Sequence, residues 1–179
     1  MKRFFSFVLI SIFLFSCGRK YNTQMPIQET ECIEHLKREI LMRVNRELVE
    51  EDSQVIKEFV EKQNWEMNTS ETGLWYMIYN DGSGEKATIG KTVTIEYTLS
   101  LLNEEICYST DERGPVTFML GYNDEYESGL QEALQMMRAG DWARLILPPH
   151  LAHGLLGDLE CIPKRAAVVY EVKLLAIES

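Results

Sequence analysis

The sequence contains few of the residues that bind metal ions. Its 179 residues include three histidines and four cysteines, and no two cysteines form a C-x-x-C pair. Structural zinc sites use cysteine and histidine ligands at such spacings, so zinc is not expected. His150 and His153 stand three apart in "PPHLAHG", a spacing that can place two imidazoles on one metal, but His35 is distant in the sequence. We expect no metal and no cofactor.

Basic residues are also scarce. The chain has 18 lysines and arginines against 28 aspartates and glutamates, which gives a formal net charge of -10. Binding to nucleic acid requires a basic patch that displaces phosphate counterions, so this charge disfavours a nucleic-acid-binding protein. Internal repeats and low-complexity segments are absent as well. The length suits one ordinary domain with an appendage.

Long apolar runs are limited to the N-terminus. Residues 4–15 are apolar except for two serines, and Lys2 and Arg3 precede them. This run is too short for a membrane span, which takes about 20 residues, but it matches the hydrophobic region of a signal peptide. It ends in "LFSC", which resembles the bacterial lipobox. We predict that residues 1–17 are a lipoprotein signal peptide and that a lipid on Cys17 anchors the protein to a membrane of the cell envelope. An ordinary signal peptide or an uncleaved anchor is the alternative.

A polar tether and a helical segment follow. Residues 18–26 are polar and aperiodic, as expected of a tether. Apolar residues then recur at intervals of three and four, which predicts an amphipathic helix; they are Ile33, Leu36, Ile40, Val44 and Leu48. The stretch "EEDS" is expected to end this helix, with Asp52 or Ser53 capping a second one. We assign residues 27–66 to this segment. It is too small to be stable alone and must pack on the following domain or on a partner.

Residues 67–179 are predicted to form the main domain. After Gly73 apolar and polar residues alternate, which predicts β-strands. The alternating stretches are residues 74–79, 93–99, 116–120, 142–147 and 168–174. One short helix intervenes, with its C-terminal cap expected at Gly140. Its apolar side consists of Leu130, Ala133, Leu134 and Met137. The pattern predicts an α+β domain, an antiparallel sheet with one helix across its face.

Five segments of this domain carry more than an alternating pattern: "GKTVTIEYTLSLL", "PVTFMLG", "GLQEALQMMRAGDWARLILP", "AHG" and "IPKRAAVVYEVKLLAI". In order and spacing they resemble the FKBP-type peptidyl-prolyl cis-trans isomerases. The likeness covers residues 73–179 without a large gap. The stretch before it looks like the exported lipoprotein branch, which includes gliding-motility-associated members. The resemblance implies an antiparallel half-barrel sheet wrapped on one short helix, preceded by the N-terminal helical segment, with an aromatic pocket between sheet and helix.

The resemblance also implies isomerisation of Xaa-Pro bonds without covalent chemistry. Resonance stiffens the C–N bond and sets a barrier of about 18–20 kcal/mol. Because resonance separates charge, water favours the planar form and a dry apolar pocket favours the twisted one. Such a site needs apolar walls and hydrogen-bond donors. The expected partners are therefore proline-containing polypeptides.

Carried over position by position, the resemblance implies a set of pocket residues. The expected catalytic residues are Tyr97, His153 and Tyr170. The expected substrate-binding residues are Tyr108, Val116, Phe118, Tyr126, Glu127, Leu130 and Ile162. The main-chain N–H of Glu127 is the expected donor to a bound peptide carbonyl. His153 stands where the family has a tyrosine that donates to the substrate, and imidazole keeps an N–H to donate whether neutral or charged; a loop histidine without a role is the alternative.

Two positions depart from the family pattern. Two adjacent positions in the family hold an aromatic wall residue and a carboxylate beside the reacting bond. This chain has Cys107 and Tyr108 at these positions. The alignment puts Cys107 and Cys161 on the pocket rim, and we hypothesise that they approach closely enough for a disulfide; two small apolar wall residues are the alternative. Leu130, Val116 and Cys107 are smaller than the family's usual wall residues, so weak macrolide binding is expected.

These departures leave three functions open. The first is an exported prolyl isomerase that assists protein folding. The second is a catalytically weakened chaperone or binding module that grips proline-containing segments. The third is an assembly lipoprotein of an envelope machine that docks through its helices. The retained Tyr97, Phe118, Ile162 and Tyr170 favour the isomerase. A homodimer through the N-terminal helices is one way in which their apolar stripe is covered.

Overall fold

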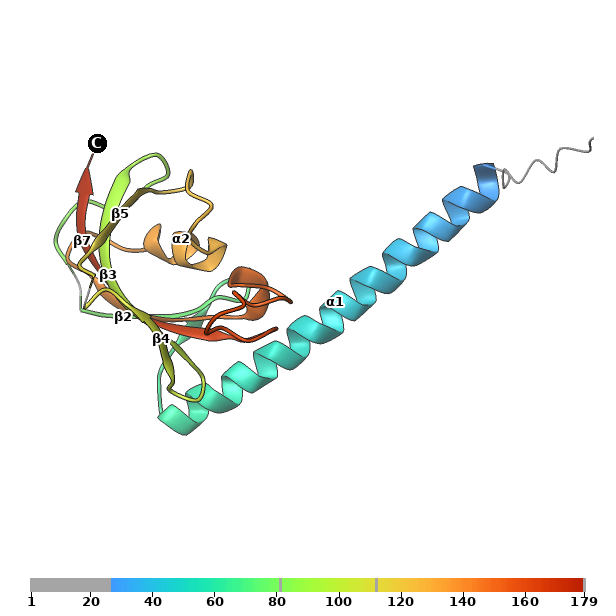
Figure 1. Ribbon diagram of the computed structural model, residues 1–179, viewed down its shortest axis with the longest axis horizontal. Helices are drawn as coiled ribbons and strands as arrows, with labels where there is room; N and C mark the ends of the chain where they lie inside the picture. The colour runs from blue at the N-terminus through green and yellow to red at the C-terminus, as the bar shows by residue number, and fades with distance from the viewer. Residues whose placement is uncertain (1–26, 81, 112, 179) are drawn as a thin grey trace, which may run out of the picture. The chain divides into compact units, whose positions relative to one another are not determined.

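The computed structural model describes residues 27–80, 82–111 and 113–178 (Figure 1). The expected signal peptide, its lipidation at Cys17 and the tether lie outside the described residues. The chain divides into two compact units, one ending at Ile40 and the other beginning at Leu41. Helix α1 (Ile27–Gln63) contributes to both units, and the second unit holds all the described strands. Among the described residues, every helix is too short or too polar to cross a bilayer.

Helix α1 continues through the stretch "EEDS", where the sequence pattern predicted a break. The expected cap Asp52 lies inside the helix, and its carboxylate pairs with the guanidinium of Arg165 at 2.9 Å. The stretch contains no glycine or proline, and glutamate is a good helix former, so local propensity does not force a break. The ion pair with Arg165 also occupies the Asp52 carboxylate, which would otherwise be available to cap a helix end. The prediction of two helices is therefore wrong.

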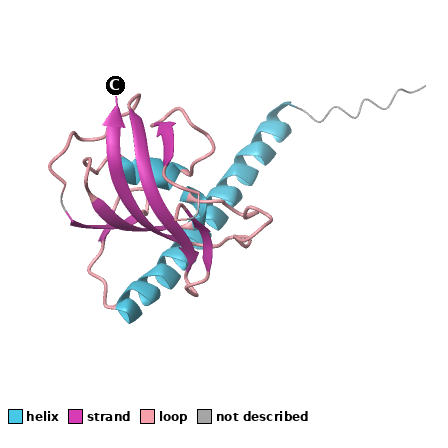
Figure 2. Ribbon diagram, turned by 60° about the vertical axis from the view of Figure 1, so that its left-hand side comes forward, coloured by secondary structure: helices cyan, strands magenta, loops and turns pink. Residues whose placement is uncertain are grey.

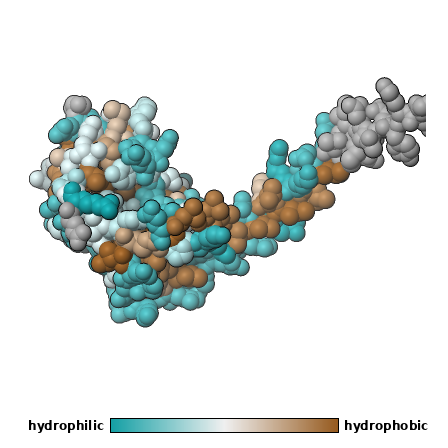
Figure 3. Space-filling view, viewed as in Figure 1, coloured by the Kyte–Doolittle hydropathy of each residue, from teal (hydrophilic) through white to brown (hydrophobic). Residues whose placement is uncertain are grey.

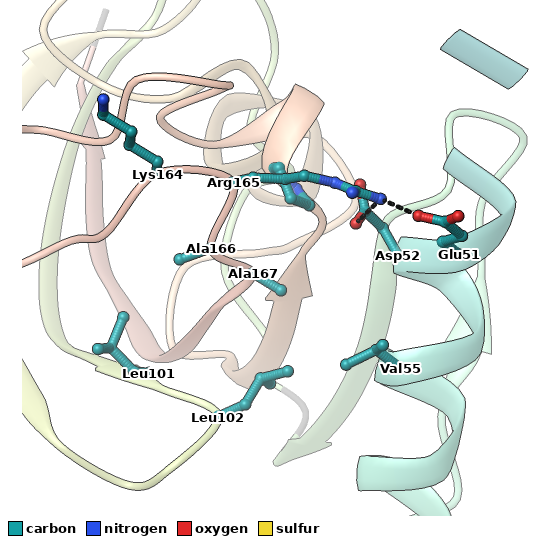
Figure 4. A pocket seen from close by; sticks show the side chains of 10 residues that line it. Glu51, Asp52, Val55, Leu101, Leu102, Lys164, Arg165, Ala166 and Ala167 are labelled. Carbon is teal, nitrogen blue, oxygen red and sulfur yellow. Dashed lines mark hydrogen bonds and ion pairs between the residues drawn. The ribbon is translucent and has the colours of Figure 1, made fainter. Parts of the chain in front are cut away.

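The last turns of α1 pack on the sheet within the second unit. Ile56 and Val60 are 0% and 5% exposed and form a small apolar cluster with two residues of the sheet. Arg165 adds polar contacts at the same helix. Its guanidinium donates to the main-chain carbonyl of Leu48 at 3.1 Å. It also pairs with Glu51 at 2.8 Å, beside its contact with Asp52 (Figure 4). This part of the helical segment therefore packs on its own domain, one of the two expected outcomes.

Within the described residues, seven antiparallel strands form one sheet (Figures 1 and 2). They are β1 (Asn68–Thr69), β2 (Trp75–Asn80), β3 (Thr92–Leu101), β4 (Ile106–Ser109), β5 (Val116–Met119), β6 (Trp142–Leu147) and β7 (Val168–Glu178). Their order is β1-β2-β6-β7-β3-β4, and β5 also pairs with β3. The two longest strands, β3 and β7, pair at the centre from Thr92 opposite Glu178 to Leu101 opposite Val168. Alternation predicts five of the strands but not β1 and β4, which have two and four residues.

Helix α2 (Ser128–Leu134) lies across one face of the sheet (Figure 2). Its Leu130 is fully buried against the sheet. The helix ends three residues before Met137, earlier than predicted, because the next three N–H groups donate to carbonyls three residues back and tighten the chain. Met137 stays fully buried in this tighter turn. Gly140 is not the helix cap: it has φ +98° and its N–H donates to the carbonyl of Leu174 at 2.7 Å, in the turn that leads into β6.

Candidate active site

A cavity of about 500 Å³ opens beside strands β3, β4 and β5 and the loop before α2. Its lining consists of Tyr97, Ile106, Cys107, Tyr108, Ser109, Thr110, Asp111, Arg113, Val116 and Tyr126. Four of these, Tyr97, Tyr108, Val116 and Tyr126, are among the predicted pocket residues. Most of the others belong to β4 and the turn after it. Of these, sequence reasoning placed only Cys107 at the pocket, on its rim; it missed the rest because it did not identify β4 as a strand and so did not place the turn after it beside β3.

Two pairs of aromatic rings lie on the core side of the cavity. The rings of Tyr97 and Tyr170 have centroids 5.4 Å apart and planes tilted by 51°. The rings of Phe118 and Tyr126 stack, with centroids 4.1 Å apart and planes at 19°. Tyr126 and the smaller Val116 both line the cavity. The ring of Tyr126 therefore supplies aromatic wall beside a position where the family pattern expects a larger side chain.

Four of the predicted residues lie beneath the cavity and not on its lining. Phe118, Leu130, Ile162 and Tyr170 are between 0% and 4% exposed and belong to the main apolar core. The rings of the cavity wall pack against this core. The buried residues therefore support the tyrosine rings of the cavity wall from below.

The last two predicted residues, Glu127 and His153, line a neighbouring pocket of about 380 Å³ that shares Tyr126 with the cavity. The Glu127 side chain is 8% exposed. Its carboxylate accepts from the Tyr170 hydroxyl at 2.9 and 2.7 Å and lies 2.8 Å from Nε2 of His153. Burial, and then the Glu127 charge, raise the pKa of Tyr170 well above its ordinary value, so the hydroxyl remains a donor. These residues form one hydrogen-bonded cluster, which we call the Glu127 cluster.

The contact with Glu127 limits what His153 can donate. A carboxylate only accepts, so Nε2 of His153 carries the proton in this arrangement. A neutral imidazole has one N–H, which leaves Nδ1 as an acceptor. Only the imidazolium has a second N–H for a substrate carbonyl. While the Glu127 contact is kept, only the charged form has an N–H left for another acceptor; the role of His153 as a donor to substrate stays a prediction.

A disulfide joins Cys107 on β4 to Cys161, with Cα atoms 5.5 Å apart, which confirms the hypothesis of a bond between these cysteines. Tyr108, the next residue on β4, donates its hydroxyl to the carboxylate of Asp158. This hydrogen bond is the main reason that the pKa of Tyr108 rises to about 12. Asp158 also accepts the main-chain N–H of Ile162 at 2.8 Å. The disulfide and these hydrogen bonds hold the loop that carries Ile162 against the cavity.

Asp158 is expected to make the stability of this loop acid-sensitive. Burial acts to raise its pKa, but the Tyr108 hydroxyl and the main-chain N–H groups of Glu160 and Ile162 outweigh it and lower the pKa. A carboxyl with a lowered folded-state pKa stabilises the fold above its unfolded value of about 3.9, and the stabilisation is lost as the pH falls through the folded value. Asp158→Asn should therefore reduce the free energy of unfolding at neutral pH. In acid, the free energies of unfolding of the variant and of the unsubstituted protein should become equal.

Urea denaturation at neutral and acid pH measures this difference. Asp124→Asn, an exposed aspartate on the loop before α2, is the matched control and should show no such convergence. A deficit of Asp158→Asn that stays constant from neutral pH to below about pH 3 would contradict the role of the charge.

The family model of the FKBP-type peptidyl-prolyl cis-trans isomerases matches residues 83–175, more than half of the chain. A probable FKBP-type isomerase of Haemophilus influenzae is 31% identical over 113 residues, which cover 63% of the chain and 46% of that protein. FkpA, an FKBP-type isomerase of Escherichia coli, is 33% identical over 125 residues, 68% of the chain and 45% of that protein. The outer membrane protein MIP of Legionella longbeachae is 32% identical over 108 residues, which cover 60% of the chain and 45% of that protein.

Two solved structures are similar along much of the chain. The crystal structure of FkpA from Escherichia coli has a TM-score of 0.63 at 26% identity and covers 87% of the chain and 74% of its own. The crystal structure of AtFKBP13 has a TM-score of 0.59 at 25% identity and covers 62% of the chain and 98% of its own. These matches confirm the predicted fold class. The chain spans about half the length of the curated relatives that it matches.

Proposed function

Since the chain belongs to the FKBP-type peptidyl-prolyl cis-trans isomerases, we propose that it accelerates the cis–trans isomerisation of Xaa-Pro bonds and so assists the folding of exported or envelope proteins. The observation that carries this proposal is the cavity walled by Tyr97 and Tyr126 above the buried rings of Phe118 and Tyr170. It lies in the part of the chain that the family model matches, and it offers a proline ring an apolar, aromatic surface.

The cavity acts on the bond by removing water. In water the planar amide is stabilised because solvent hydrates its separated charges; against the rings of Tyr97 and Tyr126 that hydration is lost, and the twisted, less polar form is favoured. Interactions made only with the twisted form raise the rate. The main-chain N–H of Glu127 and a charged His153 are the proposed donors that orient the peptide carbonyls. Both belong to the loops next to the shared Tyr126.

The direct test is the isomerisation of a tetrapeptide with a Leu-Pro bond, followed with an isomer-specific protease. The spontaneous reaction takes tens to hundreds of seconds at about 25 °C. The protein is expected to shorten this time in proportion to its concentration. No acceleration at micromolar protein would remove the enzymatic proposal.

A slow binding module is the second candidate, and one observation favours it. Tyr108 occupies the position where the family has a carboxylate, and its hydroxyl is engaged by Asp158. The Tyr108 hydroxyl therefore stabilises the loop that holds Asp158 and is not available to the substrate. A protein that binds the Leu-Pro peptide without changing its isomerisation rate would be this binding module, acting as a chaperone or an assembly lipoprotein.

We further propose that two copies of the chain pair through their N-terminal helices. In the first unit, Ile33, Leu36 and Ile40 are 41%, 55% and 48% exposed and recur at helical spacing along α1. A row of exposed apolar side chains on a helix loses its contact with water when a second helix covers it.

Replacing Leu36 and Ile40 by glutamate should convert a dimer into a monomer, because like charges would meet where apolar side chains packed. Sedimentation equilibrium measures the mass of each form. Arg38→Glu, an exposed substitution on the same helix, is the control and should remain dimeric. A chain that is monomeric before any substitution would refute this pairing.

We also propose that the protein is held in the cell envelope by a lipid on Cys17. The lipobox-like "LFSC" supports this assignment, and one relative is named an outer membrane protein. Cys17→Ser should move the protein from the membrane fraction to the soluble fraction. Recovery of the unsubstituted protein in the soluble fraction alone would count against the anchor.

A further inference from the structure

The side chain of Glu127 is turned away from the helix that it precedes. Residues directly before a helix often accept main-chain N–H groups of that helix with their side chains, but within the described residues Glu127 forms no such bond to α2. Its carboxylate instead accepts the hydroxyl of Tyr170 on β7 at 2.9 and 2.7 Å. It also lies 2.8 Å from Nε2 of His153, which follows the 3₁₀ helix η1 (Pro149–Leu151). The carboxylate therefore binds two other segments of the chain and not its own helix.

Burial holds the carboxylate in this place. The Glu127 side chain is 8% exposed and Tyr170 is 2% exposed, so water has little access to the contact between them. The ring of Tyr170 belongs to the main apolar core, where close packing keeps it in position. A buried carboxylate that loses its donors is destabilised. Tyr170 therefore holds the carboxylate, and the carboxylate holds Nε2 of His153.

Two polar groups next to this contact are left for a ligand. The His153 side chain is 27% exposed and lines the pocket of about 380 Å³ that shares Tyr126 with the cavity. Among the residues that the structure describes, none forms a hydrogen bond with Nδ1 of His153 or accepts the main-chain N–H of Glu127. A peptide beside Tyr126 can therefore meet both groups.

We propose that Glu127 is a positioning residue whose carboxylate fixes which nitrogen of His153 carries the proton, and that it thereby makes peptide binding and isomerisation depend on the charge of His153. This inference rests on the proposed function, because it takes a peptide carbonyl to lie beside Tyr126. While the carboxylate holds Nε2, a neutral His153 presents the lone pair of Nδ1, which cannot donate to a carbonyl oxygen. The imidazolium presents an N–H at the same place.

Acidic groups and phenols surround the Glu127 cluster. The acidic groups are Asp124, Glu125 and Glu127, which line the pocket with His153, and Asp158; the phenols are those of Tyr97, Tyr126 and Tyr170. Figure 3 shows hydrophilic surface on this side of the domain, beside α2 and the loop before it.

Histidine is the residue type among these groups that changes charge between about pH 5 and 8. Burial acts to raise the pKa of Asp158, but the groups that lower it, which include His153, prevail, so Asp158 stays charged in this range. Burial is also the main reason that the pKa values of Tyr97 and Tyr126 are raised, which keeps both phenols neutral. A change of peptide binding in this range is therefore assigned to His153.

The experiment compares Glu127→Gln with Glu125→Gln. The first variant removes the charge but keeps an acceptor for the Tyr170 hydroxyl. Because a carboxamide also donates, it can give an N–H to Nε2 and leave the proton of a neutral His153 on Nδ1. Glu125 is exposed and lines the same pocket, whereas the hydrogen bonds to His153 and Tyr170 come from Glu127. Glu125→Gln is therefore a matched control for the loss of one negative charge.

Two readouts are taken at about pH 6 and about pH 8. Nitrogen-15 spectra of the labelled imidazole show which nitrogen of His153 is protonated. A protease-free assay gives kcat/KM for a Leu-Pro tetrapeptide. His153→Phe, which keeps a ring without nitrogen, is measured in the same way, and circular dichroism shows that each variant is folded.

We expect the unsubstituted protein and Glu125→Gln to keep the proton on Nε2 at about pH 8, with kcat/KM at least about fivefold lower than at about pH 6. In Glu127→Gln, the neutral His153 should carry its proton on Nδ1 when the peptide is bound, and the two values of kcat/KM should agree within about twofold. His153→Phe should also lose the dependence on pH, at the low level of the neutral protein.

The same pH dependence in Glu127→Gln and in the unsubstituted protein would overturn the inference. So would a neutral His153 of the unsubstituted protein with its proton on Nδ1, or a pH dependence that persists in His153→Phe. A protein that accelerates isomerisation at neither pH would remove the proposed function. In that case, the imidazole spectra and the dissociation constant of the Leu-Pro peptide at the two pH values decide the inference by the same criteria.

Discussion

Replacing Tyr126 by alanine is expected to lower kcat/KM for a Leu-Pro tetrapeptide by at least about tenfold, a loss of about 1.4 kcal/mol in transition-state binding. Tyr126 lines the cavity and its ring stacks on Phe118 with centroids 4.1 Å apart. Without this ring, water gains access to the cavity floor and hydrates the planar imide, so the preference for the twisted form is weakened. The protease-coupled isomerisation assay measures the loss.

Tyr122 provides a matched control four residues earlier in the chain. It is 72% exposed and does not line the cavity, so Tyr122→Ala removes the same ring without touching the site. The control should keep its activity within about twofold. If both variants lose activity equally, the ring of Tyr126 has no special part in the reaction. If neither does, the reaction takes place elsewhere on the protein.

Replacing Cys107 and Cys161 by serine is expected to lower the free energy of unfolding by about 4 kcal/mol. The disulfide closes a loop with a sequence separation of 54 residues, and in the chain-entropy model the loss follows from the freedom that the unfolded chain regains. For a chain of this size the melting temperature should fall by about 10 °C. Urea denaturation and calorimetry under oxidising conditions measure the two quantities.

Cys32 is the control for this pair. It is an exposed free cysteine, and Cys32→Ser should leave the unfolding curve unchanged. Treatment of the unsubstituted protein with a reductant should reproduce the loss seen in the double variant. Two additional titratable thiols in the oxidised protein, with no difference between the curves, would show that the bond does not form.

Local pattern was sufficient to predict the long elements of the fold. Strands such as β3 and β7 bury one face, so their apolar residues alternate and the sequence alone identifies them. Strand β4 was not predicted, because its first residue, Ile106, is 64% exposed and the strand is only four residues long. The continuity of α1 was not predicted for a different reason. Asp52 forms an ion pair with Arg165, more than a hundred residues away, and the local sequence "EEDS" gives no sign of that contact.

The site was predicted in part for the same reasons. The family pattern supplied residues such as Tyr97, Val116 and Tyr126, which line the cavity. It did not supply the Glu127 cluster, because the pattern assigned Glu127 a role through its main chain only. The carboxylate, the Tyr170 hydroxyl and the His153 imidazole come from three separate segments that meet only in the folded chain. A buried hydroxyl without an acceptor is costly. Tyr170 in the terminal strand was therefore the one residue from which the sequence indicated a buried hydrogen-bond acceptor nearby.

The position of the bound proline tests the central claim most directly. Nuclear Overhauser contacts between the proline ring of a Leu-Pro peptide and the protein can be measured while isomerisation is under way. We predict contacts to the ring protons of Tyr97 and Tyr126, which face the cavity. Contacts confined to another surface, with isomerisation still accelerated, would contradict the claim that this ring-lined cavity is where the bond is twisted.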